Sequence, residues 1–291
     1  MDKPNITQAM IDAYDEYTHL TLDRRGFMQK LSGLAGSAAA AAAVAPLLAA
    51  SSAKAAMVAP DDPSVTAVWA THDIGGTAMK CYLVRPAEGE GPFPAVIVIH
   101  ENRGLNSHIQ DVARRIAKEG FIALAPDFLS AEGGTPPDED KARELIGGLD
   151  AETTLELAVH IEEFLREMKE VNGKVGAVGF CWGGGLVNDL AVADLQLKAG
   201  VAYYGRQPKD ADVARIKASM LLHYAGLDTR INAGIDAYKA ALEKDGVEHE
   251  IYVYDGVNHA FNNDTSAARY DKAAADLAWQ RTIDFLTAKL G

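Results

Sequence analysis

Gly179-Phe180-Cys181-Trp182-Gly183-Gly184-Gly185 joins two segments of different character. The run before it, Lys174–Phe180, is apolar and rich in β-branched residues, as in a buried strand, and Gly184–Ala193 has the period of a helix. A nucleophile between glycines in such a strand-to-helix turn is typical of a nucleophile elbow. The N-terminus of the helix would favour a thiolate and a developing oxyanion. The segment therefore predicts a reactive Cys181, and the alternative is a buried structural thiol beside a glycine-rich turn.

From residue 65 onward the sequence alternates between short apolar runs and longer helical segments, which is typical of an α/β sheet. The predicted strands are Val65–Thr71, Met79–Arg85, Ala95–His100, Phe121–Ala125, Lys174–Phe180, Ala199–Tyr204, Ser219–Ala225 and Glu248–Tyr254. The predicted helices are His108–Glu119, Ala151–Lys169, Gly184–Ala193, Asn232–Asp245 and Thr265–Lys289. The Gly75-Gly76 turn predicts an antiparallel hairpin between the first two strands. We expect one domain over residues 56–291, with a doubly wound, mostly parallel sheet of about eight strands.

Two further polar residues follow predicted strands, at the sheet edge where ligands bind in such folds. Asp228 comes after the strand Ser219–Ala225, and His259 comes after Glu248–Tyr254. The chain order Cys181, Asp228, His259 is that of the α/β-hydrolase fold. Taken singly, Asp228 could form a turn and His259 could be a surface residue. Their joint order and placement predict a Cys-His-Asp triad.

Five stretches of the sequence carry a resemblance to a known family. They are His100-Glu101-Asn102-Arg103-Gly104-Leu105-Asn106, Gly120-Phe121-Ile122-Ala123-Leu124-Ala125-Pro126-Asp127, Gly176–Gly184, Tyr203-Tyr204-Gly205 and Asn258-His259-Ala260-Phe261. With them, the chain from about residue 65 to its C-terminus resembles the dienelactone hydrolase (carboxymethylenebutenolidase) family. The resemblance implies that Cys181 is the nucleophile, His259 the general base and acid, and Asp228 the group that orients His259. It implies no metal or organic cofactor.

The resemblance also implies roles for three residues around the triad. Glu101 would contact the resting thiol and help to convert it to thiolate, which is reasonable for a partly desolvated carboxylate. The alternative for Glu101 is a solvated loop acid or an ion-pair partner of Arg103. The backbone N–H groups of Trp182 and Asn102 would form the oxyanion hole.

The substrate-binding arginines of that family are matched only in part. Family members hold the carboxylate of dienelactone with two arginines, and one of these matches Arg143, on a short predicted helix after Asp127. The second would lie a few residues after His259, where this chain has Asn263. Losing one bidentate contact removes about 1.5–3 kcal/mol. Arg103 or Arg206 could compensate, or each could be a rim or surface charge.

Residues 1–55 are predicted to be a twin-arginine (Tat) signal peptide. Arg24-Arg25 precedes the uncharged, alanine-rich stretch 31–53, and Ala53-Lys54-Ala55 fits the small-x-small pattern of signal peptidase sites. The expected location is the periplasm or the exterior, with the Tat machinery as partner. An uncleaved membrane anchor and a chance Arg-Arg before a linker of a cytoplasmic protein are the alternatives. Residues 1–23 are amphipathic and receive no predicted role.

Composition limits the remaining possibilities. The chain has 291 residues and a formal net charge of -13, which argues against a nucleic-acid groove or a stable anionic-membrane partner. It has only two cysteines, so a disulfide framework is not expected. The sequence predicts no oligomeric state.

These observations predict a hydrolase that cleaves a small ester or lactone through an acyl-thioester on Cys181. The first alternative is a general carboxylesterase or lactonase of the same fold with an unrelated substrate. The second is a periplasmic thiol-redox protein, although the chain has no C-x-x-C motif. A binding module without enzymatic activity is the third, and the triad argues against it.

Overall fold

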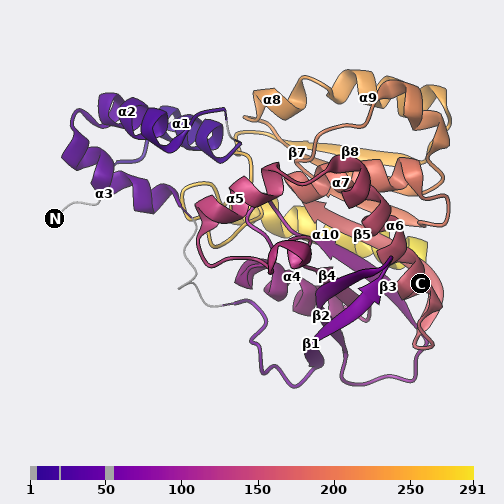
Figure 1. Cartoon of the computed structure of the whole chain (residues 1–291). Coiled ribbons are helices and arrows are strands. Elements are labelled where there is room, and N and C mark those ends of the chain that lie inside the picture. The colour runs from indigo at the N-terminus through magenta and orange to yellow at the C-terminus, as the bar shows by residue number, and fades with distance from the viewer. Residues whose placement is uncertain (1–4, 20, 50–55) are drawn as a thin grey trace.

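The computed structural model describes residues 5–19, 21–49 and 56–291, and its centre is an eight-stranded sheet (Figure 1). The strands lie in the order β1-β2-β4-β3-β5-β6-β7-β8. Their bounds are β1 Val65–Ile74, β2 Thr77–Pro86, β3 Phe93–Ile99, β4 Ile122–Pro126, β5 Val171–Phe180, β6 Ala199–Tyr203, β7 Ser219–Ala225 and β8 His249–Tyr254. All eight predicted strands are present, so the α/β-hydrolase prediction is confirmed at the level of the sheet.

The sheet is mixed at one edge and parallel elsewhere. β1 and β2 form the predicted antiparallel hairpin, which turns at Gly75-Gly76. β2 then pairs antiparallel with β4, and β4, β3, β5, β6, β7 and β8 run parallel to one another. The carboxyl ends of the parallel strands therefore meet at one edge, where ligands bind in open sheets.

Helices cover both faces of the sheet. The helices of the α/β domain are α4 Ser107–Lys118, α5 Glu139–Gly147, α6 Ala151–Glu167, α7 Trp182–Ala193, α8 Thr229–Asn232, α9 Ile235–Lys244 and α10 Lys272–Leu290. One apolar core includes buried side chains of α6, α7 and α9, and the other includes side chains of α4 and α10. Because both faces are covered, the central strands β3, β6 and β7 are almost entirely buried and mostly apolar, as in other parallel sheets.

Two predicted helices differ from the structure. The helix predicted as Asn232–Asp245 begins only at Ile235, because Asn232 ends the short helix α8 and Gly234 occupies the N-cap position of α9. The helix predicted as Thr265–Lys289 begins only at Lys272, where the Asp271 side chain accepts a hydrogen bond from the Ala274 N–H at 2.9 Å. Asp271 is a favourable N-cap residue, so the helix starts after it and the preceding residues form turns.

The described residues before position 50 form an N-terminal helical unit of three helices. These are α1 Gln8–Thr18, α2 Arg24–Ala35 and α3 Ala38–Leu48. Asp23 caps α2 and Ser37 caps α3, and the apolar sides of the helices form a separate small core that includes Tyr14, Phe27 and Leu48. In Figure 1 this unit extends from one side of the α/β domain, near α5.

The amphipathic stretch 1–23, which received no predicted role, contains helix α1, and the apolar side of this helix packs in that small core. Its polar side contacts the α/β domain, as the pairing of the Gln8 and Asn258 side-chain amides shows. The signal peptide over residues 1–55 stays a prediction, and its cleavage pattern Ala53-Lys54-Ala55 lies outside the described residues. Among the described helices, none alone meets the length and hydropathy of a membrane span. α2 and α3 meet them only as a pair, which is bent by 111°.

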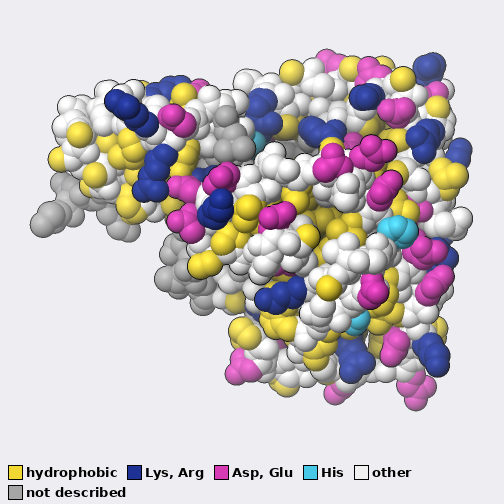
Figure 2. Space-filling model, in the orientation of Figure 1, with side chains coloured by type: hydrophobic (Ala, Val, Ile, Leu, Met, Phe, Trp, Pro, Cys, Tyr) yellow, Lys and Arg dark blue, Asp and Glu magenta, His cyan; other side chains and the backbone are white. Residues whose placement is uncertain are grey.

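Acidic and basic side chains are interspersed on the face of the molecule shown in Figure 2. Arg24 on α2 pairs with Asp140 on α5 at 3.1 Å, across the boundary between the N-terminal helical unit and the α/β domain. Such an exposed pair contributes little to stability. Both cysteines of the chain are free thiols, in agreement with the expectation of no disulfide framework.

Candidate active site

Cys181 stands in a strained turn between β5 and α7. Its φ of 54° and ψ of -112° are unfavourable for a residue with a side chain, and such strain is common at functional sites. A Cβ on Gly179 would lie 2.2 Å from the Gly183 carbonyl oxygen, and a Cβ on Gly183 would lie 2.5 Å from the His100 carbonyl oxygen. Glycine is therefore required at both positions, and the turn is the predicted elbow.

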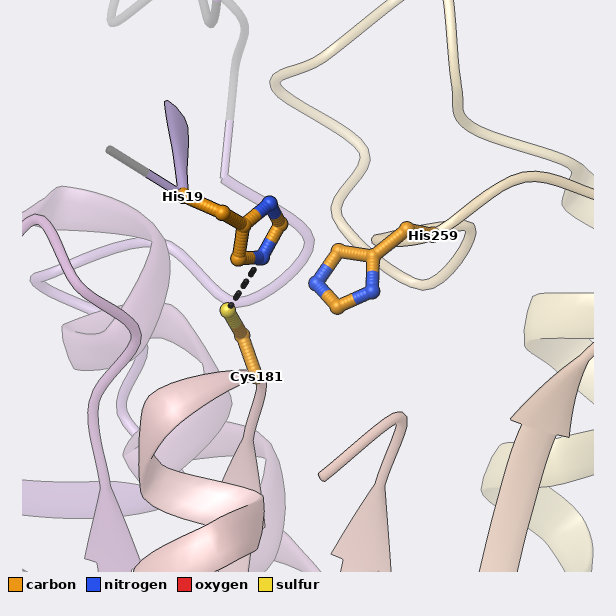
Figure 3. Close-up of side chains that lie close together, drawn as sticks. All are labelled: His19, Cys181 and His259. Carbon is orange, nitrogen blue, oxygen red and sulfur yellow. Dashed lines mark hydrogen bonds between the residues drawn. The ribbon is translucent and has the colours of Figure 1, made fainter. Parts of the chain in front are cut away.

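Asp228 and His259 lie together beside this turn. Both are buried, and His259 Nδ1 lies 2.5 Å from Asp228 Oδ2. Asp228 also caps α8 by accepting a hydrogen bond from the Ile231 N–H at 3.1 Å, which fixes the carboxylate. His259 Nε2 is buried without a hydrogen-bond partner. The ring of His259 lies beside Cys181 (Figure 3), so the structure brings together all three predicted triad residues.

A second histidine that the sequence did not indicate contacts the thiol. His19, at the C-terminal end of α1, places Nε2 3.5 Å from Cys181 Sγ (Figure 3). Its ring meets that of His259 edge to face, with centroids 4.6 Å apart. The Asp15 carbonyl lies 2.8 Å from His19 Nδ1, which orients the imidazole. No motif marks His19, since it lies far in sequence from the elbow and inside the segment predicted as a signal peptide.

The electrostatics of the site favour a thiolate next to an imidazolium. Burial alone would raise the pKa of Cys181, but His259 and His19 outweigh it and lower the pKa to about 6. Burial would lower the pKa of His259, but the negative charges of Cys181, Asp15 and Asp228 raise it well above its ordinary value. Burial opposes the charge of Asp228 too, and its bond to His259 nevertheless lowers its pKa to about 2.

Glu101 is buried next to the site and is held by Asn263. Its Oε2 accepts a hydrogen bond from Asn263 Nδ2 at 2.9 Å, while Oε1 has no hydrogen-bond partner. Burial would raise the pKa of Glu101, but the charges of Arg103, His108 and Arg269 lower it. Glu101 and Cys181 line one small cavity, although the hydrogen-bond contact of the thiol is to His19. The carboxylate is thus a desolvated anion rather than a solvated loop acid.

Trp182 and Asn102 line one cavity together with Cys181. Trp182 is the first residue of α7, so its N–H has no intrahelical acceptor and is free for an oxyanion. Its indole stacks on His100 at 5.3 Å. Asn102 donates from Nδ2 to the Thr18 carbonyl at 2.6 Å, so its side chain is bound to the N-terminal helical unit.

The two predicted substrate-binding arginines also contact that unit. Arg143 lines the cavity at Cys181, pairs with Asp140 and lies over the Tyr17 ring at 4.6 Å. Arg103 is buried, donates to the Tyr14 hydroxyl at 3.0 Å and lies 3.3 Å from a Glu139 oxygen. Arg206 pairs with Asp189 at the rim, in agreement with the alternative that Arg206 is a rim or surface charge.

Arg269 is a further arginine of the site that the sequence interpretation missed. It is buried, lines the small cavity with Glu101 and Cys181, and lies 3.8 Å from Asp15. The sequence predicted a helix from Thr265 onward, whereas the turns before Lys272 direct Arg269 to the site. A guanidinium therefore lines the cavity of Cys181 from a residue ten positions after His259, whereas the second family arginine was expected a few positions after it.

Two cavities open beside His19 and His259. One, of about 210 Å³, is lined by Cys181, Trp182, Arg143 and Tyr204 among others. The other, of about 230 Å³, lies towards Asp228 and Arg269. Among the described residues, two groups are close enough to hold a metal ion, His19 with Cys181 and His259, and Asp15 with Asp228 and His259.

A mixed sheet with a strained cysteine turn after β5, an aspartate after β7 and a histidine after β8 defines an α/β-hydrolase. The sequence model of the dienelactone hydrolase family matches residues 79–290. The chain is 35% identical over 228 residues to the "Putative carboxymethylenebutenolidase" of Yersinia pestis, covering 73% of this chain and 84% of the relative.

Solved structures agree with this match. The "Putative Dienelactone Hydrolase" of Klebsiella pneumoniae superposes with a TM-score of 0.70 at 29% identity, over 77% of this chain and 98% of that one. The "Dienelactone Hydrolase-like Promiscuous Phospotriesterase P91" from metagenomic libraries has a TM-score of 0.70 at 25% identity, over 78% and 100%. The chain belongs to the dienelactone hydrolase family. It is a hydrolase of a class that acts on esters or lactones.

Proposed function

We propose that the protein hydrolyses a small ester or lactone through a Cys-His-Asp triad of Cys181, His259 and Asp228. The observation that carries this proposal is the thiol of Cys181 in a strained turn, beside a buried His259 that is bonded to Asp228. A thiol in an ordinary core position would have neither the strain nor the adjacent imidazole.

In the proposed reaction, the Cys181 thiolate attacks the carbonyl carbon of the substrate. The tetrahedral oxyanion accepts hydrogen bonds from the backbone N–H groups of Trp182 and Asn102. The intermediate collapses to an acyl-thioester, and the imidazolium of His259 protonates the leaving alkoxide. His259 then takes a proton from water, which attacks the thioester and releases the acid and the thiolate. Asp228 keeps Nδ1 of His259 bonded throughout, so that Nε2 exchanges the protons.

Glu101 acts in this proposal as the initial proton acceptor of the thiol or as a fixed negative charge that orients it. Its unpaired Oε1 and its location in the same cavity as Cys181 support either role. Arg143, Arg103 and Arg269 would bind a substrate carboxylate, since a buried or half-enclosed guanidinium forms strong bidentate pairs. In the full chain, Tyr17, Tyr14 and Asp15 respectively contact these three guanidinium groups.

The test is a hydrolysis screen in the presence of a chelator, with acyl esters of increasing length against cis- and trans-dienelactone. Cys181→Ala should lose turnover of every substrate, and Cys81→Ala is the matched control. Preference for dienelactone supports binding of the substrate carboxylate by the arginines. Preference for neutral acyl esters supports the general carboxylesterase alternative. Turnover retained in Cys181→Ala would contradict the triad. Peroxide consumption at Cys181 without hydrolysis would favour the thiol-redox alternative.

We also propose that residues 1–55 are a Tat signal that delivers the enzyme to the periplasm or the exterior. Support comes from the exposed Arg24-Arg25 pair and the uncharged stretch after it. Replacing both arginines by lysine should leave the protein unprocessed in the cytoplasm. Unchanged export of that variant would contradict the proposal.

A further inference from the structure

We propose that His19, Cys181 and His259 form a three-ligand binding site for Zn²⁺, to which the N-terminal helical unit contributes one ligand. The site forms only when α1 is docked on the α/β domain. Its existence does not depend on the proposed hydrolysis, whereas its effect as an inhibitory site rests on that function. The set of one cysteine sulfur and two imidazole nitrogens suits Zn²⁺, which favours such ligands in tetrahedral geometry.

The distance between the thiol and the new histidine fits this coordination. With Zn–S near about 2.3 Å and Zn–N near about 2.0–2.1 Å, a tetrahedral angle places S and N about 3.5–3.6 Å apart. Cys181 Sγ and His19 Nε2 are 3.5 Å apart. The ligand atoms of all three residues lie within 4.8 Å of one another. Small side-chain rotations are therefore enough to close the three ligands around one ion.

The two imidazoles are oriented as in metal sites. Metal-binding histidines usually direct the second ring nitrogen to a carboxylate or a carbonyl, which fixes the tautomer. His259 has Nδ1 at 2.5 Å from Asp228, and His19 has Nδ1 at 2.8 Å from the Asp15 carbonyl. Both rings thus present Nε2 towards the sulfur (Figure 3), and His259 Nε2 is buried without a hydrogen-bond partner.

A fourth coordination position would remain open. The three ligands line the cavity of about 210 Å³ that also includes Trp182 and Tyr204. Water from this cavity can complete the tetrahedron, as in zinc sites with three protein ligands. Binding displaces any proton on the thiol or on Nε2 to solvent, and no electron is transferred. Because the ion occupies the sulfur and His259 Nε2 together, it blocks nucleophilic attack and proton transfer at once.

The location of His19 in the N-terminal segment makes the zinc site dependent on whether that segment is removed. His19 lies within residues 1–55, so removal of this segment would leave only Cys181 and His259 as ligands. The full chain would bind Zn²⁺ more tightly than the processed enzyme. The reactive thiol would thus be masked while the N-terminal segment is attached.

The experiment uses the metal-free full chain and titrates it with ZnCl₂. Equilibrium dialysis should give one Zn²⁺ per chain for the wild type. His19→Gln should weaken the affinity at least about 10-fold. His160→Gln is the matched control, since that histidine is half exposed on α6, and should bind as the wild type does. Far-ultraviolet circular dichroism of each variant checks the fold.

A second measurement uses Co²⁺ in place of Zn²⁺ to observe the ligands directly. A thiolate-to-cobalt charge-transfer band should appear in the wild type, disappear in Cys181→Ser and weaken or shift in His19→Gln. Added Zn²⁺ should inhibit ester hydrolysis reversibly, and excess chelator should restore it. Equal Zn²⁺ affinity of wild type and His19→Gln would overturn the proposal, whether or not His19 affects turnover. Zn²⁺ binding in a protein that hydrolyses no ester would overturn the proposed function and leave the site standing.

Discussion

The two cysteines of this chain occupy opposite environments. Cys81 lies in the middle of β2 with no exposed surface, and its thiol is 3.7 Å from the Met79 carbonyl. Burial, together with the negative charge of Asp127, raises its pKa to about 12. Cys181 is only partly buried and lines a cavity, and two imidazoles outweigh its desolvation and lower its pKa to about 6. Burial therefore raises the pKa of the Cys81 thiol, whereas the two histidines beside Cys181 lower the pKa of that thiol.

The largest expected effect comes from removing the reactive thiol. Cys181→Ala should lower kcat/KM for an activated ester at least about 1,000-fold, because no other group can form the acyl intermediate. Cys81→Ala should leave kcat/KM within about twofold, because that side chain contacts only the core. Initial rates for both variants at equal concentration of folded protein check this contrast. A similar loss in both variants would mean that the two cysteines differ less than their surroundings indicate.

The next largest effect is expected from changing Asp228, the hydrogen-bond partner of the His259 imidazole. Asp228→Asn should lower kcat by about 100- to 10,000-fold, since the amide cannot stabilise the imidazolium and favours the wrong tautomer. The same change should raise the pKa of Cys181, because a less basic His259 stabilises the thiolate less. Steady-state kinetics from pH 5 to 9 measure both. Asn232→Ala, on the same short helix α8, serves as a control for local disturbance. Unaltered kcat in Asp228→Asn would rule out the orienting role.

Alkylation should separate the two thiols by pH. With a chelator present, the rate of iodoacetamide labelling at Cys181 should rise through pH 6 and then level off, because the thiolate is the reacting form and is already complete above that pH. Cys81 should stay unlabelled in the folded protein across this range, since its thiol remains protonated and inaccessible. Peptide mass spectrometry reads both sites in one sample. A Cys181 rate that continues to rise through pH 9 would show an ordinary thiol.

A smaller effect on the labelling of Cys181 is expected from replacing His19, the second imidazole beside the thiol. His19→Gln removes one of the two imidazoles that lower the pKa of Cys181, so the pH midpoint of labelling should move upward by less than in Asp228→Asn. His160→Gln should leave the midpoint in place. A midpoint unchanged in His19→Gln would mean that α1 does not remain docked in solution.

The smallest effect is expected on the free energy of unfolding when Cys81 is replaced. Cys81→Ala removes a buried sulfur from the core and should lower the free energy of unfolding by about 1 kcal/mol. Cys181→Ala should change it less, because the thiol lines a cavity rather than filling the core. Urea unfolding followed by circular dichroism measures both values. A larger loss in Cys181→Ala would indicate a structural role for that residue.

The features that depend on local sequence pattern could be predicted from the sequence. Apolar runs predicted all eight strands, and glycines around Cys181 predicted the elbow that close backbone contacts require. Asp228 and His259 were predictable because carboxyl ends of parallel strands converge.

Features that depend on contacts between distant segments were not predictable. Nothing in the amphipathic pattern of residues 1–23 indicates that His19 would meet Cys181, because the pattern marks an apolar face without naming its partner. Arg269 was assigned to a helix because the period of its neighbours continues into α10, while the capping residue Asp271 ends that period earlier. Whether Arg143 and Arg103 bind substrate depends on Tyr17 and Tyr14, which only the folded chain brings to them.

The central claim, that Cys181 is the nucleophile, is tested most directly by trapping the acyl-enzyme. A slowly hydrolysed activated ester is mixed with the chelator-treated protein, quenched in acid and analysed by peptide mass spectrometry. The account predicts one acyl group on the peptide that contains Cys181, none on the peptide that contains Cys81, and none in Cys181→Ala. Steady turnover with no acyl group on Cys181 at any quench time, and with Cys181→Ala still active, would contradict it.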